Sequence, residues 1–251
     1  MKQKKPTRRV GLARALSKLG YFSRSQAAEL IRAGRVRLNG GVTREPETPV
    51  RLGQDRIVAD GNAVGAPKKI YLMMNKPRGL VTTASDEQGR ETVYAVLEKD
   101  GEALPWVAPV GRLDKASEGL LLLTNDSEWG ARIAARETHL EKTYHVQIGK
   151  VADEEFTRAI VSGVRSEDGD LLRAIQARVL RSGAKNCWLE IVLDEGKNRQ
   201  IRRGLGALGV EVLRLVRVAI GPLQLGRLAK GSYRPLTDEE KLALDRAMAA
   251  K

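Results

Sequence analysis

The sequence predicts an α+β protein in which a small basic α/β unit precedes a larger unit built on a mixed, largely antiparallel sheet. Strand and helix patterns alternate irregularly and several are joined by hairpin-type turns. The four consecutive leucines of Leu120–Leu123 are typical of a strand buried on both faces. Residues 1–68 hold fifteen Lys and Arg against five Asp and Glu, which gives +10 of the total net charge of +13.

The composition restricts the class of partner and the compartment. A chain of 251 residues with 42% hydrophobic residues is long enough for a real core. The net charge of +13 indicates a polyanionic partner, and nucleic acid is favoured over a membrane because no apolar run approaches the length of a span. The N-terminus lacks the apolar core of a secretory signal, and the single cysteine, Cys187, excludes an internal disulfide and a cysteine-based zinc cluster. We expect a cytoplasmic, metal-free protein and, by default, a monomer.

Local signals divide the first quarter of the chain into short elements. Residues 1–8 are expected to form a flexible basic arm. A helix with Leu12, Leu16 and Leu19 on one stripe ends at Gly20. A second helix begins at Ser23 with a capping box to Gln26 and ends at Gly34, and strands follow at Arg35–Leu38, Val42–Thr43 and Arg56–Ala59. Asn39-Gly40 is a hairpin turn signal between the first two strands.

Arginines gather in this helix-helix-hairpin unit. The cluster consists of Arg14, Arg24, Arg32, Arg35 and Arg37. Such side chains can hold phosphates without reading bases. The alternative is that they only solvate a small domain, but the sign bias is too strong for a neutral solubilising surface.

The larger unit is expected to begin after a linker at residues 65–68. Its predicted strands are Ile70–Asn75, Leu80–Thr83, the leucine run, Lys142–Ile148, Trp188–Leu193 and Val212–Val216. Its predicted helices are Thr92–Leu97, Ser127–Ile133, Asp153–Ser162, one that carries Arg199, Arg202 and Arg203 and ends near Gly209, and a last one opened by the capping box Thr237 and Glu240.

The run Gly111–Asp126 joins a charged turn, which contains Asp114, directly to the leucine strand. A carboxylate fixed at the end of a rigid buried strand is well placed for chemistry, although an ordinary charged turn would look similar. The sequence has no phosphate-binding glycine loop, no dinucleotide fingerprint and no visible Ser–His or Cys–His arrangement. His139 and His145 lack a matching ligand set. The remaining possibility is nucleophilic or acid–base catalysis by a carboxylate side chain.

Two known families resemble this chain. Residues 9–60, with Leu-Asn-Gly at positions 38–40, resemble the S-four-type RNA-binding domain of ribosomal proteins. About residues 69–240 resemble the RsuA-type ribosomal RNA pseudouridine synthases. Five segments carry this second resemblance in order: Asn75–Thr83, Gly111–Asp126, Glu141–Tyr144, Glu195–Arg203, and the closing pair Ile220–Leu223 and Tyr233–Thr237.

The resemblance implies domains and roles. It implies an S-four-type domain at 9–64, a pseudouridine synthase fold at 69–251 and a cofactor-free isomerase that takes a flipped uridine from structured ribosomal RNA. Asp114 would be the catalytic carboxylate, acting on the ring, on the sugar or on a proton. Tyr144 would stack on the base and assist proton removal, and Arg202 would pair with Asp114, with Arg199 or Arg203 as the alternative partner.

Further residues would complete the site by the same resemblance. Arg112 would fill the space left by the flipped uridine, and Leu215 would pack beneath the base or simply belong to the core. Lys76, Arg199 and Arg203 join the arginines of the front unit as expected RNA contacts.

The substrate and two other function classes stay open at this point. The amino-acid pattern of residues 198–203 favours a large-subunit ribosomal RNA substrate over a small-subunit one. A non-catalytic ribosome-assembly factor would not need Asp114, Tyr144 and Arg202 together. A DNA-binding protein is disfavoured because no recognition helix with base-reading side chains stands out.

Overall fold

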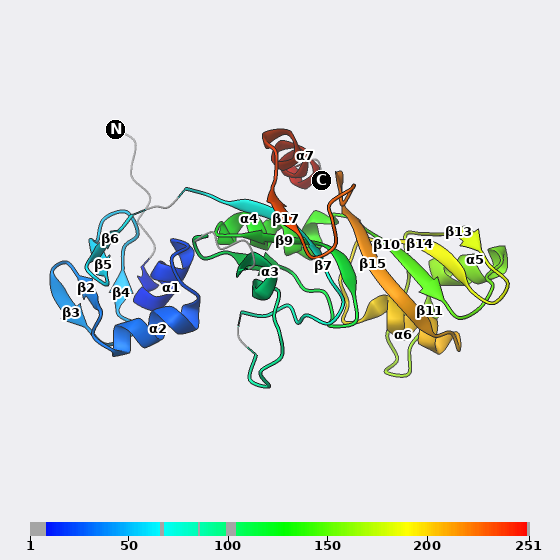
Figure 1. Ribbon diagram of the computed structural model, residues 1–251, viewed down its shortest axis with the longest axis horizontal. Coiled ribbons are helices and arrows are strands. Elements are labelled where there is room, and N and C mark those ends of the chain that lie inside the picture. Colours follow the sequence, from blue (N-terminus) through cyan, green and yellow to red (C-terminus); the bar gives the residue numbers. More distant parts are fainter. Residues whose placement is uncertain (1–8, 66–67, 85, 99–103, 250–251) are drawn as a thin grey trace. The chain divides into compact units, whose positions relative to one another are not determined.

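The structure is a computed structural model that describes residues 9–65, 68–84, 86–98 and 104–249 (Figure 1). The predicted basic arm, residues 1–8, and part of the predicted linker lie outside the described residues. The chain forms two compact units. Of the described residues, the first unit contains 9–65, 68–70, 104–108 and 124–127, and the second contains the rest.

The first unit packs two helices against short strands. Its elements are β1 Val10–Gly11, α1 Leu12–Lys18, α2 Arg24–Arg32, β2 Val36–Leu38, β3 Gly41–Thr43, β4 Pro49–Val50, β5 Ile57–Ala59 and β6 Asn62–Val64. Within the described residues, four of the strands form an antiparallel sheet in the order β3-β2-β5-β6, and β1 pairs with β4. Leu12, Leu16 and Ile31 are fully buried between the helices and the strands.

The local signals of this unit act as the sequence predicts. The Ser23 side chain accepts from the Gln26 main chain at 3.1 Å, and the Gln26 side chain accepts from the Ser23 main chain at 2.9 Å, so the capping box is confirmed. Asn39 and Gly40 have φ values of 50° and 91°, both in the left-handed region that a two-residue hairpin turn requires.

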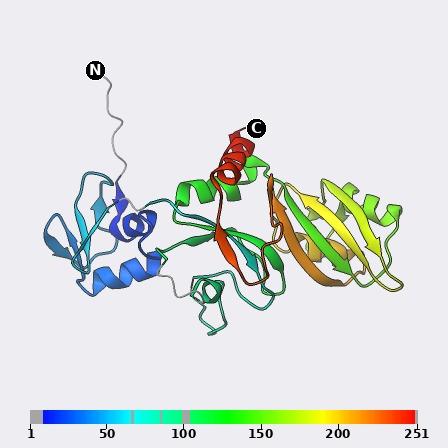
Figure 2. The same ribbon diagram turned by 45° about the horizontal axis from the view of Figure 1, so that its top comes forward.

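The second unit is built on one large sheet (Figure 2). In the described part of the chain, the sheet has nine strands in the path order β13-β14-β10-β15-β9-β7-β17, with β16 beside β15 and β8 beside β9. The strands are β7 Tyr71–Lys76, β8 Ala108–Val110, β9 Glu118–Thr124, β10 Lys142–Ile148, β13 Gln176–Ser182, β14 Cys187–Leu193, β15 Val212–Ile220, β16 Leu223–Gln224 and β17 Tyr233–Pro235. Strand β15 pairs in parallel with β9 but antiparallel with β10, so the sheet is mixed and largely antiparallel, as predicted.

Helices cover this sheet and a separate hairpin accompanies it. The helices are α3 Tyr94–Glu98, α4 Ser127–Ala134, the 3-10 turn Arg136–Thr138, α5 Glu154–Ser162, α6 Gln200–Ala207 and α7 Asp238–Ala249. The hairpin consists of β11 Val164–Arg165 and β12 Leu171–Leu172. Across the described ranges, none of the helices combines the length and the apolar character needed to cross a membrane.

Two hydrophobic cores lie in the second unit. One surrounds β9 and takes residues from α4 and α7, and the other surrounds β10 and β14 and takes residues from α5 and α6. All seven residues of β9 are buried, and Leu120–Leu123 are fully buried. The prediction of a strand buried on both faces is therefore confirmed, and β9 gives the turn before it a rigid anchor.

Some predicted elements differ from the structure. Leu80–Thr83 is not a strand, because Thr82 Oγ1 donates to the Leu113 carbonyl at 2.7 Å and only an isolated bridge joins Val81 to Thr92. The strand expected at Val212–Val216 continues to Ile220. The helix expected to contain Arg199 begins one residue later, since Arg199 has a φ of 47°.

Candidate active site

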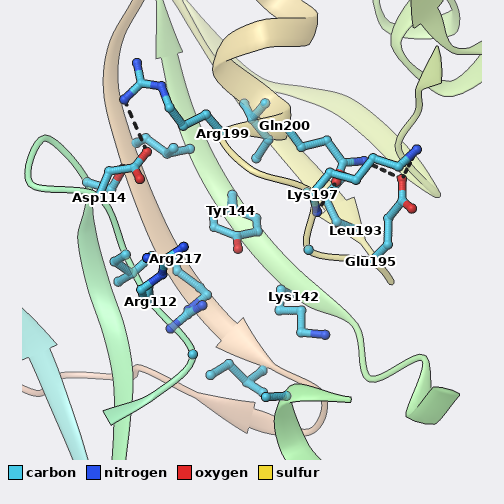
Figure 3. A pocket seen from close by; sticks show the side chains of 18 of the residues that line it. Arg112, Asp114, Lys142, Tyr144, Leu193, Glu195, Lys197, Arg199, Gln200 and Arg217 are labelled. Atoms are coloured by element: carbon cyan, nitrogen blue, oxygen red, sulfur yellow. Dashed lines mark hydrogen bonds and ion pairs between the residues drawn. The ribbon is translucent and has the colours of Figure 1, made fainter. Parts of the chain in front are cut away.

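A cavity of about 240 Å³ lies in the second unit, between the turn before β9, strands β10 and β15, and the start of α6 (Figure 3). Asp114 enters it from the turn, Tyr144 from β10 and Arg199 from the segment before α6. Segments far apart in the sequence thus bring together several of the residues that the sequence analysis selected.

The turn that carries Asp114 is fixed through its main chain. The Ser117 amide donates to the Asp114 carbonyl at 2.9 Å, and the Gly79 amide donates to the Lys115 carbonyl at 2.8 Å. Thr82 Oγ1 also accepts from the Leu113 amide at 3.3 Å. These bonds hold the turn from both sides and so fix the point from which the Asp114 side chain enters the cavity.

The Lys76 side chain also holds this turn in place. Its side chain is fully buried, and Nζ donates to the carbonyls of Pro77, Asp114 and Ser117 at 3.1, 3.2 and 2.9 Å. Burial lowers the pKa of Lys76 to about 8, although the charges of Asp114 and Glu118 oppose that shift. The expectation that Lys76 contacts RNA is wrong for this structure, because the ammonium group points inward to satisfy main-chain oxygens.

The ion-pair partner of Asp114 differs from the predicted one. Arg199 Nη1 lies 3.6 Å from Asp114 Oδ2, and both side chains are partly exposed (Figure 3). Arg199 precedes α6 in the left-handed conformation, with a φ of 47°. This is uncommon for a residue with a side chain, and such backbone strain is often found at functional sites.

Arg202, the predicted partner of Asp114, lies in the first turn of α6 and contacts main-chain carbonyls instead. Its guanidinium donates to the carbonyls of Val212 at 3.2 Å and Ala116 at 3.1 Å, and among the described residues it forms no ion pair. Burial lowers the pKa of Arg202, Arg199 lowers it further and Asp114 raises it, so Arg202 still feels the Asp114 charge. Arg202 is therefore directed at main-chain carbonyls, and the ion pair with Asp114 is made by Arg199.

Tyr144 and Leu215 line the cavity from neighbouring strands. Tyr144 is half-buried and is labelled near the centre of Figure 3. Leu215 is buried, lines the same cavity and also belongs to the core around β10. Leu215 therefore belongs to the core and also faces the cavity, and its packing beneath a base stays a prediction.

Of the other two predicted arginines, Arg112 lines the cavity and Arg203 does not. Arg112 is exposed and lines the cavity. Arg203 is directed away to the segment between β11 and β12, where Nη2 contacts Asp168 and Asp170, each at 2.8 Å. The structure therefore brings Arg112 to the site but not Arg203.

Arg217 and Lys142 are among the cavity residues that the sequence analysis did not select. Arg217 is buried, its Nε donates to the Leu120 carbonyl at 2.7 Å, and it lines the cavity beside Lys142. Burial lowers the pKa of Lys142, and the charge of Arg217 lowers it further. Arg217 is two residues after Leu215 on an inward-facing strand, so the alternation would have revealed it had the predicted strand not ended at Val216.

Basic side chains dominate the cavity wall. The basic residues are Arg112, Arg136, Lys142, Lys197, Arg199, Arg202 and Arg217, and the acidic ones are Asp114, Asp194 and Glu195. Glu195 lies 3.4 Å from Lys197, and Asp194 lies 3.4 Å from His139. Within the ranges that the structure describes, no group of three or more His, Cys, Asp or Glu side chains could hold a metal. The arrangement suits a polyanionic substrate presented to one carboxylate.

The arginines predicted to bind RNA in the first unit are all exposed. Arg24 pairs with Glu47 at 3.1 Å, and Arg35 makes two hydrogen bonds to Asp60 at 2.6 and 2.9 Å. Arg37 donates to the Gly40 carbonyl at 3.4 Å. Arg14 and Arg32 form no ion pair with any described residue, so their charges are the most available to a ligand.

Comparison with known families agrees with this fold. Residues 70–207 match the family described as RNA pseudouridylate synthase, and residues 10–57 match the S4 domain. The chain belongs to the RNA pseudouridine synthases, in the arrangement with an S4 domain in front. The resemblance noted from the sequence is thereby confirmed, and the protein is an isomerase that acts on RNA.

Individual relatives cover nearly the whole chain. An RNA pseudouridine synthase of Aquifex aeolicus is 37% identical over 243 residues, 96% of each chain. Ribosomal large subunit pseudouridine synthase B of Bacillus subtilis is 34% identical, over 95% of this chain and 96% of its own. A crystal structure of a pseudouridylate synthase, 29% identical, superposes with a TM-score of 0.64 over 94% of this chain and 99% of the other.

Proposed function

We propose that the protein converts one uridine of large-subunit ribosomal RNA into pseudouridine, with Asp114 as the catalytic carboxylate. The observation that carries this proposal is the position of Asp114. Its main chain is held by Lys76, and its side chain, 36% exposed, is presented to the cavity next to Arg199. The reaction exchanges the N1 glycosidic bond of the uridine for one to C5, and it balances without a second substrate.

Two arginines lie close to the Asp114 carboxylate. Arg199 is 3.6 Å away, and Arg202 is close enough for Asp114 to raise its pKa. A carboxylate attacks an electrophile or accepts a proton in its charged form, and a neighbouring guanidinium can orient it. Arg199 and Arg202 therefore both act on Asp114, one by contact and one through its field.

The size of the cavity suits a single nucleotide. At about 240 Å³ it is smaller than typical drug-sized pockets of roughly 300–1,000 Å³. A uridine has to leave its stack to enter such a site. Tyr144 would then stack on the base above Leu215 and assist removal of the C5 proton, while the exposed Arg112 would occupy the space left in the RNA.

Two observations support ribosomal RNA as the substrate. The relative from Bacillus subtilis, 34% identical over almost the full length, is named a large-subunit synthase. The S4 domain, which precedes the catalytic unit in the sequence, adds an RNA-binding surface. A second contact with the RNA raises the effective concentration of the substrate at the cavity.

Mapping of pseudouridines in ribosomal RNA tests the proposal. A strain that lacks the gene is complemented with the wild type, with Asp114→Asn or with Asp238→Asn, an exposed aspartate of α7 that serves as the matched control. We expect one large-subunit site to be lost in the deletion strain and restored by the wild type and by Asp238→Asn, but not by Asp114→Asn.

Three results would contradict the proposal in different ways. Restoration by Asp114→Asn would remove Asp114 from catalysis. Loss of a small-subunit site instead would change the substrate. Unchanged pseudouridines together with defective ribosome assembly would indicate a non-catalytic factor.

A further inference from the structure

The sheet of the second unit has a face opposite the cavity that combines arginines with a tryptophan. Along β14, Cys187, Leu189 and Ile191 are buried in the core shared with α5 and α6. Because successive side chains in a strand point to opposite faces, Trp188 and Glu190 lie on the other face. Strands β13, β14, β10 and β15 lie side by side here (Figure 2).

The strand register arranges this face in rows. One row consists of Arg181, Trp188, Gln147 and Arg214, and the next consists of Arg178, Glu190, His145 and Val216. The register shifts between Val179 and Arg181, so Leu180 is an extra residue in β13. Such a bulge re-aims side chains, and here Leu180 and Arg181 both line the same hollow.

The hollow is centred on Trp188. It has a volume of about 410 Å³ and is lined by His145, Leu180, Arg181, Trp188, Arg214 and Val216. The Arg181 and Arg214 guanidiniums lie 5.1 and 5.9 Å from the centre of the Trp188 ring, within cation–π range. Leu180, 38% exposed, adds an apolar edge.

The charges of the two rows favour an anionic ligand. They contain three arginines and one glutamate, Glu190, whose carboxylate is already 2.7 Å from Arg178 and 3.4 Å from His145. Arg214 also contacts Glu118 at 2.8 Å. Arg181 forms no ion pair within the described residues, so its charge is free to meet a phosphate.

We propose that this face binds a single-stranded segment of the RNA substrate, with a base in the hollow over Trp188 and the backbone along Arg181 and Arg214. Open sheets that carry an aromatic platform between cations bind single strands in this way, since stacking tolerates any base and the cations follow the phosphates. This second contact lies on the opposite face of the sheet from Tyr144 and goes beyond the proposed function.

Fluorescence anisotropy with a labelled decauridylate tests the inference on the full-length protein. The variants are Arg181→Gln, Trp188→Leu and Trp188→Phe. Arg158→Gln, which removes an exposed arginine of α5, is the matched control. We expect Arg181→Gln and Trp188→Leu to weaken binding roughly five-fold or more, Trp188→Phe to stay close to the wild type, and the control to have no such effect.

Turnover separates this proposal from the catalytic one. Arg181→Gln should raise KM for a long ribosomal RNA transcript and leave kcat unchanged, whereas Asp114→Asn should bind the oligonucleotide like the wild type. Equal affinity of the wild type and Arg181→Gln, with no decrease in the tryptophan fluorescence of the wild type on binding, would overturn the inference and leave the face to a protein partner. Arg181→Gln and the fluorescence measurement decide the matter even if Trp188→Leu does not fold.

Discussion

At the scale of single residues, the position of Asp114 depends on groups that never touch its carboxylate. Lys76 Nζ donates to the carbonyls of Asp114 and Ser117, which are the two ends of the turn. A buried cation that satisfies main-chain oxygens is costly to desolvate, and it is retained where it fixes a geometry. Lys76 is therefore a positioning residue.

Lys76→Met should lower kcat much more than it raises KM, because the turn loses its clamp while the cavity wall is preserved. The pH dependence of stability provides a second measurement. The pKa of Lys76 is 10.5 in the unfolded chain and about 8 in the fold, so the unfolded state binds more protons between these values. Wild-type stability should therefore gain about 3 kcal/mol relative to Lys76→Met as the pH rises from 8 to 10.5.

Urea unfolding of both proteins at several pH values measures this difference. Other groups titrate alike in the two proteins and cancel in the comparison. Parallel stability curves would show that the ammonium group is not buried as described.

Residue motifs predicted much of the site. Asp114, Tyr144, Leu215 and Arg112 all line the cavity as the sequence analysis required. The choice between Arg199 and Arg202 could not be made, because it depends on a single left-handed residue before α6. Lys76 was misplaced because a lysine beside a proline-containing turn looks exposed unless the carbonyls that it satisfies are known.

At the scale of elements, the close pairing of β9 with β15 depends on a glycine. Gly119 has a φ of 102°, and a Cβ there would overlap the Arg217 carbonyl oxygen and lie 2.8 Å from the Arg217 nitrogen. Glu118, its neighbour, is paired with Arg214 and Lys230. Burial raises the pKa of Glu118, but these hydrogen bonds more than offset this and hold it at about 2.

Gly119→Ala should destabilise the protein by about 2–4 kcal/mol, because both the backbone conformation and the contact with β15 become unfavourable. Gly169→Ala is the matched control, with a φ of 84° and open space around the added carbon. Both variants place an alanine in a left-handed backbone conformation, but only Gly119→Ala also overlaps a neighbouring strand. Thermal unfolding of the two variants therefore separates the cost of the backbone conformation from the cost of the steric overlap. Equal losses of stability would mean that the approach of the two strands contributes nothing.

The elements were predictable where their signals are local. Capping residues, turn glycines and the leucine run gave α2, the β2–β3 hairpin and β9, and strand alternation gave β10 with the bounds that the structure has. Strand β13 was missed because none of its residues is buried and a bulge at Leu180 interrupts its alternation of exposed and half-buried residues. The parallel pairing of β9 with β15 is a long-range contact that no local pattern reveals.

At the scale of the whole molecule, the net charge of +13 is concentrated in the first 68 residues, and their arginines differ in availability. Arg14→Gln and Arg32→Gln should each weaken RNA binding and reduce the slope of log affinity against log salt by roughly 1. Arg35→Gln, which removes a guanidinium already held by Asp60, should change the slope less. Binding titrations at several salt concentrations measure these slopes, and equal slopes for all three variants would contradict the distinction.

The junction of β9 with β15 also bears on how the molecule folds. Strand β9 pairs with β15 through Glu118 with Val216 and Gly119 with Arg217, positions about one hundred residues apart. Strand β15 supplies Leu215 to one hydrophobic core and Ile220 to the other, so both cores are complete only once β15 has joined β9. Contacts between such distant segments form slowly because the intervening loop has to be ordered. Asp114 adjoins one core, and Tyr144 and Arg199 adjoin the other. Recovery of catalysis during refolding should therefore follow the last docking step and lag behind the return of secondary structure.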